Sequence, residues 1–187
     1  MLKKILLAIG VLVIIIAGYF VFLMLTTKSH SPAAVAEYKD GDFHIQVNYS
    51  QPYKKERLIF GSAADDALVP YGEKWRTGAN EATEISFSHD VILDGQILKA
   101  GRYSLYTIPE ASTWTVVFNS KLEYWGAQLS GDPFDETLDV LRVPASVENG
   151  MPEQEQFTIS FDEEGSRINM HFDWADTRAT LGIERAQ

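Results

Sequence analysis

The sequence of 187 residues contains no cysteine. This absence excludes disulfide bonds, thiolate zinc sites, a cysteine nucleophile and a lipid-modified N-terminal cysteine. Positive charge is also scarce, because 16 Lys and Arg residues stand against 26 Asp and Glu residues, giving a formal net charge of −10. A non-specific nucleic-acid binder needs a basic face to displace counterions, so we expect no nucleic-acid partner.

Familiar catalytic and cofactor motifs are missing as well. The chain contains no G-x-S-x-G, H-E-x-x-H, P-loop or G-x-G-x-x-G pattern. Carboxylates gather between Asp132 and Asp139, but their spacing does not match a calcium-binding EF-hand loop, so a solvated acidic loop is the favoured interpretation. We therefore predict no metal, no cofactor and no catalytic residue, and whether the protein is an enzyme stays open, with the balance against it.

One long hydrophobic run stands at the N-terminus. Residues 5–25 carry no charge, and as a helix they would be about 30 Å long, which matches the hydrocarbon core of a bilayer. Lys3 and Lys4 precede the run, so the positive-inside rule places residues 1–4 in the cytoplasm and the rest of the chain outside. We predict a single-pass signal anchor in the bacterial inner membrane, with the lipid bilayer as a partner. The alternative is secretion after cleavage of a signal peptide near Ala36.

The remainder reads as a short connection followed by strands. Residues 26–36 have the small and polar composition of a linker, and Pro32 argues against a helix continuing into the domain. Residues 37–187 show repeated period-two alternation of apolar and polar residues, which indicates strands with one buried face. The clearest runs are 43–49, 83–87, 114–118, 157–161 and 168–174.

Turn signals join several of these runs. Asp94-Gly95 predicts a tight hairpin, and the segment 163–166 predicts a second one between the two longest alternating runs. Weaker strand candidates are 138–143 and 179–183, and residues 50–72 read as a long irregular loop. We predict an all-β fold, an antiparallel β-sandwich of about 8–9 strands, preceded by the single transmembrane helix.

The most distinctive segment is VPYGEKWRTGANEAT, residues 69–83. It offers Trp75, Arg76, Asn80 and Glu81 as a polar pocket floored by an aromatic ring, in which the planar guanidinium would meet a carboxylate or another anion. A purely structural interpretation is also open. In that case Trp75 fills the core, Arg76 pairs with Glu81, and Asn80 satisfies loop backbone.

Two further aromatic residues are candidate walls of such a pocket. Tyr49 ends an alternating run, and Trp125 follows Tyr124 in a predicted loop where a ring could be exposed. Together with the polar residues of the 69–83 segment, they would provide the few convergent contacts that a small-molecule, glycan or protein ligand needs.

Several segments resemble a known bacterial family. WRTGANEAT, KAGRYSLYTIP, WTVVFN, YWGA and DVLRV occur in this order and resemble the family called domain of unknown function 2911, and YSQP resembles its YSRP segment with Gln51 in place of Arg. The resemblance covers about residues 43–183. It implies an exported β protein, mostly of Bacteroidetes-type bacteria, and it implies no reaction and no catalytic residue.

These observations predict a membrane-tethered module that binds a ligand or takes part in envelope assembly without catalysis. The alternative is a hydrolase that uses carboxylates, with Glu81 paired to Glu84 or Asp90 and acting on an envelope or extracellular substrate. A hydrolase of this kind would need one carboxyl group kept protonated by its surroundings.

Overall fold

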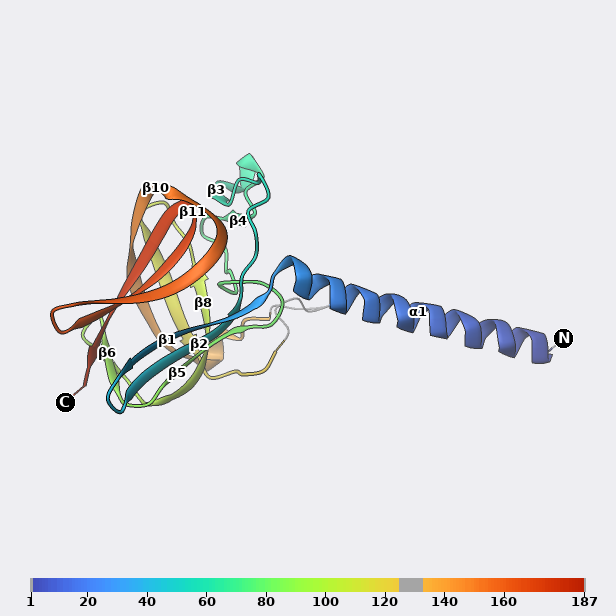
Figure 1. The fold of residues 1–187 in the computed structure, drawn as a ribbon, viewed down its shortest axis with the longest axis horizontal. Coiled ribbons are helices and arrows are strands. Elements are labelled where there is room, and N and C mark those ends of the chain that lie inside the picture. The colour runs from blue at the N-terminus through green and yellow to red at the C-terminus, as the bar shows by residue number, and fades with distance from the viewer. Residues whose placement is uncertain (1, 125–132, 187) are drawn as a thin grey trace.

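The computed structural model describes residues 2–124 and 133–186, and it consists of one helix and a β domain. Helix α1 spans Leu2–His30 and projects away from the β domain, as Figure 1 shows. The described side chains from Ile9 to Phe22 are exposed along it. Among the residues whose placement is described, no helix is sufficiently long and apolar for a membrane crossing. The transmembrane assignment of residues 5–25 therefore stays a prediction.

The connection between α1 and the domain is shorter than residues 26–36, which the sequence suggested as a linker. Residues 26–30 belong to α1, and β1 begins at Ala33, so only Ser31 and Pro32 lie between them. Pro32 has no N–H to donate and disfavours helical backbone in the residue before it, which accounts for the end of the helix at His30. The following residues pair with β2 and are therefore strand.

The domain is built on one nine-stranded antiparallel sheet. Its strand order is β1-β2-β5-β8-β9-β10-β11-β6-β7, and all neighbouring strands are antiparallel. The strands are β1 (Ala33–Asp40), β2 (Phe43–Ser50), β5 (Thr83–Phe87), β6 (Val91–Leu93), β7 (Gln96–Leu98), β8 (Gly101–Ile108), β9 (Thr113–Asn119), β10 (Asp139–Glu164) and β11 (Arg167–Arg185).

Small elements complete the chain. The strands β3 (Phe60–Gly61) and β4 (Val69–Pro70) form a separate two-stranded parallel pair, with the 3-10 helix η1 (Ala63–Asp65) between them. A second 3-10 helix, η2 (Glu136–Leu138), precedes β10. The region 50–72, expected as a long irregular loop, thus contains short regular elements.

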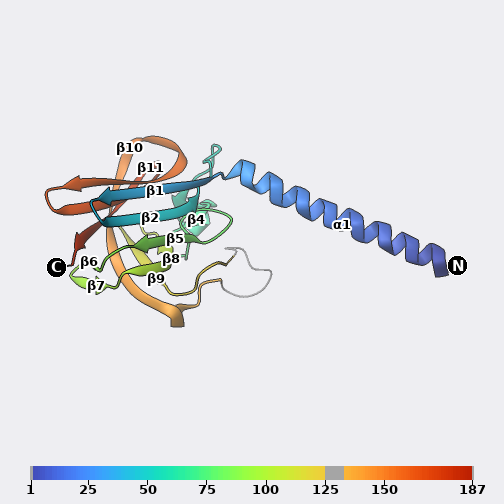
Figure 2. The ribbon, with the colours of Figure 1, turned by 60° about the horizontal axis from the view of Figure 1, so that its bottom comes forward.

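The long hairpin of β10 and β11 folds the sheet over itself. The first part of β10 pairs with β9 up to Ser146. From Ser146 onward β10 pairs with β11, with register shifts between Asn149 and Thr158. In Figure 2 this hairpin lies beside β1. The weaker strand candidates 138–143 and 179–183 are therefore not separate strands, because 139–143 begin β10, 179–183 belong to the last part of β11, and Leu138 ends η2. The predicted hairpins at Asp94-Gly95 and at 163–166 are confirmed.

The folded sheet closes through the chain that follows β2. Lys54 N–H donates to Glu155 O at 2.7 Å, and Phe157 N–H donates to Pro52 O at 3.0 Å. Two residues further along β10, Ile159 N–H donates to the Tyr49 hydroxyl at 3.0 Å. These bonds hold the second part of β10 against the end of β2, so the two halves of the sheet enclose one core, an arrangement compatible with the expected sandwich.

The core follows the predicted alternation. Phe43, Ile45, Val47 and Tyr49 of β2 are all buried, while the residues between them are less buried or exposed. The prediction of a β domain built on an antiparallel sheet is confirmed. The largest fully buried side chains are aromatic, and they include Trp114, Trp174, Tyr106, Phe118, Phe157 and Phe172.

Candidate functional site

The segment from Trp75 to Ala82 is a tightly constrained loop between β4 and β5. Trp75 exchanges two backbone hydrogen bonds with Thr107 of β8, each 2.8 Å long. Thr77 and Gly78 follow with φ of 54° and 150°. A Cβ on Gly78 would lie 2.9 Å from the carbonyl oxygen of Ser50, so only glycine fits this position without a shift. The loop therefore has a fixed shape and holds its side chains in place.

Trp75 belongs to the core and also forms the wall of a cavity. Its ring stacks on Trp174, with centroids 5.7 Å apart and planes 19° apart, and it meets Phe157 edge-on at 4.9 Å. Its indole N–H donates to Gly78 O at 3.2 Å. Trp75 thus fills the core, as the structural interpretation expected, and it presents its remaining surface to the cavity described below.

Asn80 anchors the loop to the end of α1. It is buried, has φ of 59°, and donates a hydrogen bond from Nδ2 to Ser31 O at 3.2 Å. Asparagine tolerates this left-handed backbone better than most residues. Gln51 N–H donates to Pro32 O at 2.9 Å beside it. Asn80 therefore satisfies backbone and fixes the junction between α1 and the β domain.

Tyr49 and Glu81 line a different cavity, so the structure does not bring all the predicted site residues together. This apolar groove of about 750 Å³ also contains Glu84 and Glu123. Tyr49 is itself buried, and its hydroxyl is occupied by Ile159 of β10 and by Gln51 Nε2 at 3.0 Å. Trp125, the remaining predicted wall residue, lies outside the described residues.

Arg76 lies in a cationic cavity at the foot of α1. The cavity has a volume of about 320 Å³ and is lined by three cations, Lys55, Arg57 and Arg76, with Trp75 and Trp174 among its apolar walls. No acidic side chain is among its lining residues within the described chain. A strongly acidic protein thus places three positive charges around one small cavity.

These three cations have no carboxylate partner among residues 2–124 and 133–186, and Arg76 in particular makes no ion pair with Glu81. Most other cations of the domain do form such pairs. They include Lys54, Lys74, Lys99, Arg102, Arg142, Arg178 and Arg185.

The two arginines differ in how they are held. Arg57 is exposed but positioned, because it donates from Nε to Lys54 O at 2.9 Å and from Nη2 to Tyr53 O. Arg76 is half-buried, and burial lowers the pKa of its guanidinium, an effect that nearby Tyr124 partly offsets. A buried charge without a partner is costly, so an anion that supplies the missing partner would be bound favourably.

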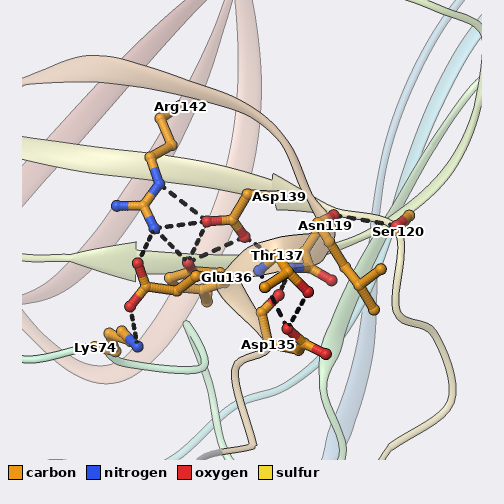
Figure 3. A network of polar contacts seen from close by, with 10 residues as sticks. Lys74, Asn119, Ser120, Asp135, Glu136, Thr137, Asp139 and Arg142 are labelled. Atoms are coloured by element: carbon orange, nitrogen blue, oxygen red, sulfur yellow. Dashed lines mark hydrogen bonds and ion pairs between the residues drawn. The ribbon is translucent and has the colours of Figure 1, made fainter.

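A second polar cluster is fully occupied by its own contacts (Figure 3). The guanidinium of Arg142 lies between Asp139, at 2.6 Å, and Glu136, at 2.7 Å, and Lys74 pairs with Glu136 at 2.5 Å. Lys74 first and Arg142 second hold the pKa of Glu136 below its usual value. Tyr106 also donates to Asp139, at 2.9 Å, and burial followed by this bond raises the pKa of Tyr106.

The acidic segment 132–139 is therefore integrated into the fold where the structure describes it. Asp135 caps η2 by accepting from Thr137 N–H at 3.1 Å, and Asn119 Nδ2 donates to Asp139 Oδ1 at 2.7 Å. Asp132 lies outside the described residues. Within the described part of the chain, no group of three His, Asp or Glu side chains could hold a metal ion.

Lys55 and Arg57 are not among the site residues that the sequence predicts, because residues 50–72 read there as an irregular loop. The available signal was local charge. The run Lys54-Lys55-Glu56-Arg57 is basic within an acidic chain. Its proximity to Arg76 depends on how this segment packs against the 75–83 loop, which the pattern of residues does not specify.

The family model for DUF2911, described as a protein of unknown function, matches residues 31–183. The chain belongs to this family. The resemblance found in the sequence is thereby confirmed, and the match begins close to Ala33, where β1 starts. Comparisons with the curated proteins and with the solved structures gave no match. The family description names no activity, so function rests on the site itself.

Proposed function

We propose that this DUF2911 protein is a membrane-tethered, extracytoplasmic β-sandwich module that binds an organic anion in the cationic cavity, without catalysis. The observation that carries the proposal is that Lys55, Arg57 and Arg76, which have no carboxylate partner in the described chain, line one cavity. A volume of about 320 Å³ is at the lower end of the range for small-molecule sites. The aromatic walls favour an anion with an apolar or ring-shaped part.

The proposed tether is α1. Its support is the uncharged run 5–25, the lysines that precede it, and the outward exposure of its described apolar side chains from Ile9 to Phe22. With the N-terminus in the cytoplasm, the β domain would lie on the outer face of the bacterial inner membrane. Secretion after cleavage near Ala36 is the alternative, although cleavage there would cut within β1.

A hydrolase that uses carboxylates is the less favoured function. Such an enzyme needs a carboxyl group that stays protonated. The Lys99 ammonium first, and then the Ala100 N–H, hold the pKa of Asp90 below its usual value. Glu84 accepts from Arg102 at 2.7 Å and from Glu123 N–H at 2.9 Å. The contacts of Asp90 thus favour its ionised form, not a protonated one.

Binding can be measured through the intrinsic fluorescence of Trp75 and Trp174, which line the cavity. Phenyl phosphate titrated into the full-length protein in a zwitterionic detergent should change the fluorescence saturably. Arg76→Gln should weaken this binding roughly tenfold or more, because a charged hydrogen bond contributes about 1.5–3 kcal/mol.

The matched control is Arg167→Gln, which removes the same charge from an exposed arginine that lines none of the described cavities. It should bind phenyl phosphate like the unmodified protein. Equal binding by all three proteins, or no saturable change in any of them, would contradict the proposed site.

A further inference from the structure

The cationic cavity adjoins the end of α1. His30 and Ser31 are among its lining residues, next to the cations. The junction is fixed, because Asn80 Nδ2 donates to Ser31 O at 3.2 Å and Gln51 N–H donates to Pro32 O at 2.9 Å. Ser31 is buried in this junction. The cavity and α1 therefore keep a set relation to each other, and the cavity cannot lie far from whatever surrounds the helix.

The length of α1 beyond the apolar run sets the level of the cavity. The uncharged run ends at Leu25, and α1 continues to His30. At about 1.5 Å per residue, these five positions add about 8 Å. The headgroup layer on one side of a bilayer is about 5–8 Å thick. If α1 spans the membrane, the part of the cavity lined by His30 and Ser31 lies at about the level of the lipid phosphates.

The chemistry of the cavity suits that layer. Arg57 and Arg76 carry planar guanidinium groups, which bind phosphate oxygens in pairs, and Lys55 adds a point charge. Trp75 and Tyr53 add amphipathic rings to the same walls. Such rings are enriched where membrane proteins meet the interface.

We propose that the cavity holds the phosphate of an anionic membrane lipid, whose acyl chains remain in the bilayer beside α1. The inference rests on the proposed function and on α1 being the membrane anchor. It goes beyond them by naming the source of the anion. A domain that binds lipid in this way would lie directly on the membrane surface and would not extend freely from it.

The test uses the full-length protein with two sets of vesicles. One set contains only phosphatidylcholine, and the other contains phosphatidylcholine with phosphatidylglycerol. After flotation and detergent extraction, the lipid that remains with the protein is measured by native mass spectrometry. We expect the protein to float with both sets and to retain phosphatidylglycerol at about one per chain. Arg76→Gln should lose most of this retention, and Arg167→Gln should keep it.

A parallel arm titrates soluble glycerol 3-phosphate into the detergent-solubilised protein, with tryptophan fluorescence as the readout. If the soluble phosphate binds in an Arg76-dependent manner but phosphatidylglycerol is not retained, the lipid inference is overturned and the anion cavity stands. If neither binds, both fail. Equal loss of lipid in Arg76→Gln and Arg167→Gln would indicate general surface charge and would overturn the inference, as would failure of the protein to float.

Discussion

The Tyr49 hydroxyl helps to close the folded sheet. Its removal should lower the free energy of unfolding more than the loss of one oxygen atom usually does. The hydroxyl oxygen is buried and accepts a hydrogen bond from Ile159 N–H at 3.0 Å. This bond continues the series of two backbone bonds that join Pro52 and Lys54 to β10. In Tyr49→Phe the ring keeps its edge-on contact with Phe157, at 5.7 Å, but the Ile159 N–H loses its acceptor. A buried donor left without a partner costs about 1–3 kcal/mol.

For a domain of this size, a loss of 2 kcal/mol lowers the midpoint of thermal unfolding by about 4–8 °C. The assay is circular dichroism of the β signal during heating. Tyr71→Phe is the control, since Tyr71 is a partly buried tyrosine packed against the same core and its hydroxyl has no hydrogen-bond partner in the described chain. Tyr71→Phe should change the midpoint little. If Tyr49→Phe unfolds at the same temperature as Tyr71→Phe, closure of the sheet through this hydroxyl is refuted.

Three other outcomes follow from the structure. Gly78→Ala should lower the unfolding midpoint clearly more than Gly41→Ala. Both glycines have positive φ, but only at Gly78 would the new Cβ lie within 3.0 Å of another backbone atom. Equal effects would contradict the tight packing of the loop. Glu136→Gln should lower the unfolding midpoint at pH 7, because the ion pairs of Glu136 stabilise its ionised form in the folded protein. The difference in midpoint between the two proteins should disappear as the pH falls below 4.5 and through the lowered pKa of Glu136. A difference that persists at low pH would show that these ion pairs are not its cause. Because the chain has no cysteine, Ser166→Cys in the exposed β10–β11 turn should react with a membrane-impermeant maleimide on intact spheroplasts, whereas Lys3→Cys should react only after lysis; the reverse pattern would invert the proposed topology.

The parts of the fold that the sequence predicted are those with a local cause. The alternation along residues 43–49 and 168–174 follows from one face being buried, so each strand is readable by itself. Asp94-Gly95 determines its own hairpin in the same way. The closure of the sheet has no local cause. It depends on the bend of β10 between Asn149 and Thr158 and on one tyrosine hydroxyl replacing a backbone acceptor.

For the candidate site, too, the sequence predicted residue types but not the contacts that depend on tertiary packing. Residue types singled out Trp75 and Arg76, and the structure places both at one cavity. The sequence could not show that Asn80 binds Ser31, or that Glu81 lines a separate groove. Asn80 has φ of 59°, so side chains along this loop do not alternate as they do along a strand. Lys55 was missed because its place beside Arg76 is set by tertiary packing alone.

The proposed function requires the guanidinium of Arg76 to bind an anion. Its Nε–H resonance in the nitrogen-15 spectrum of the full-length protein, assigned by its loss in Arg76→Lys, reports on this group alone. Titration with phenyl phosphate should shift the resonance saturably and protect it from exchange, while the resonance of Arg167 stays in place. An Arg76 resonance that does not move at concentrations that saturate the tryptophan signal would contradict the account.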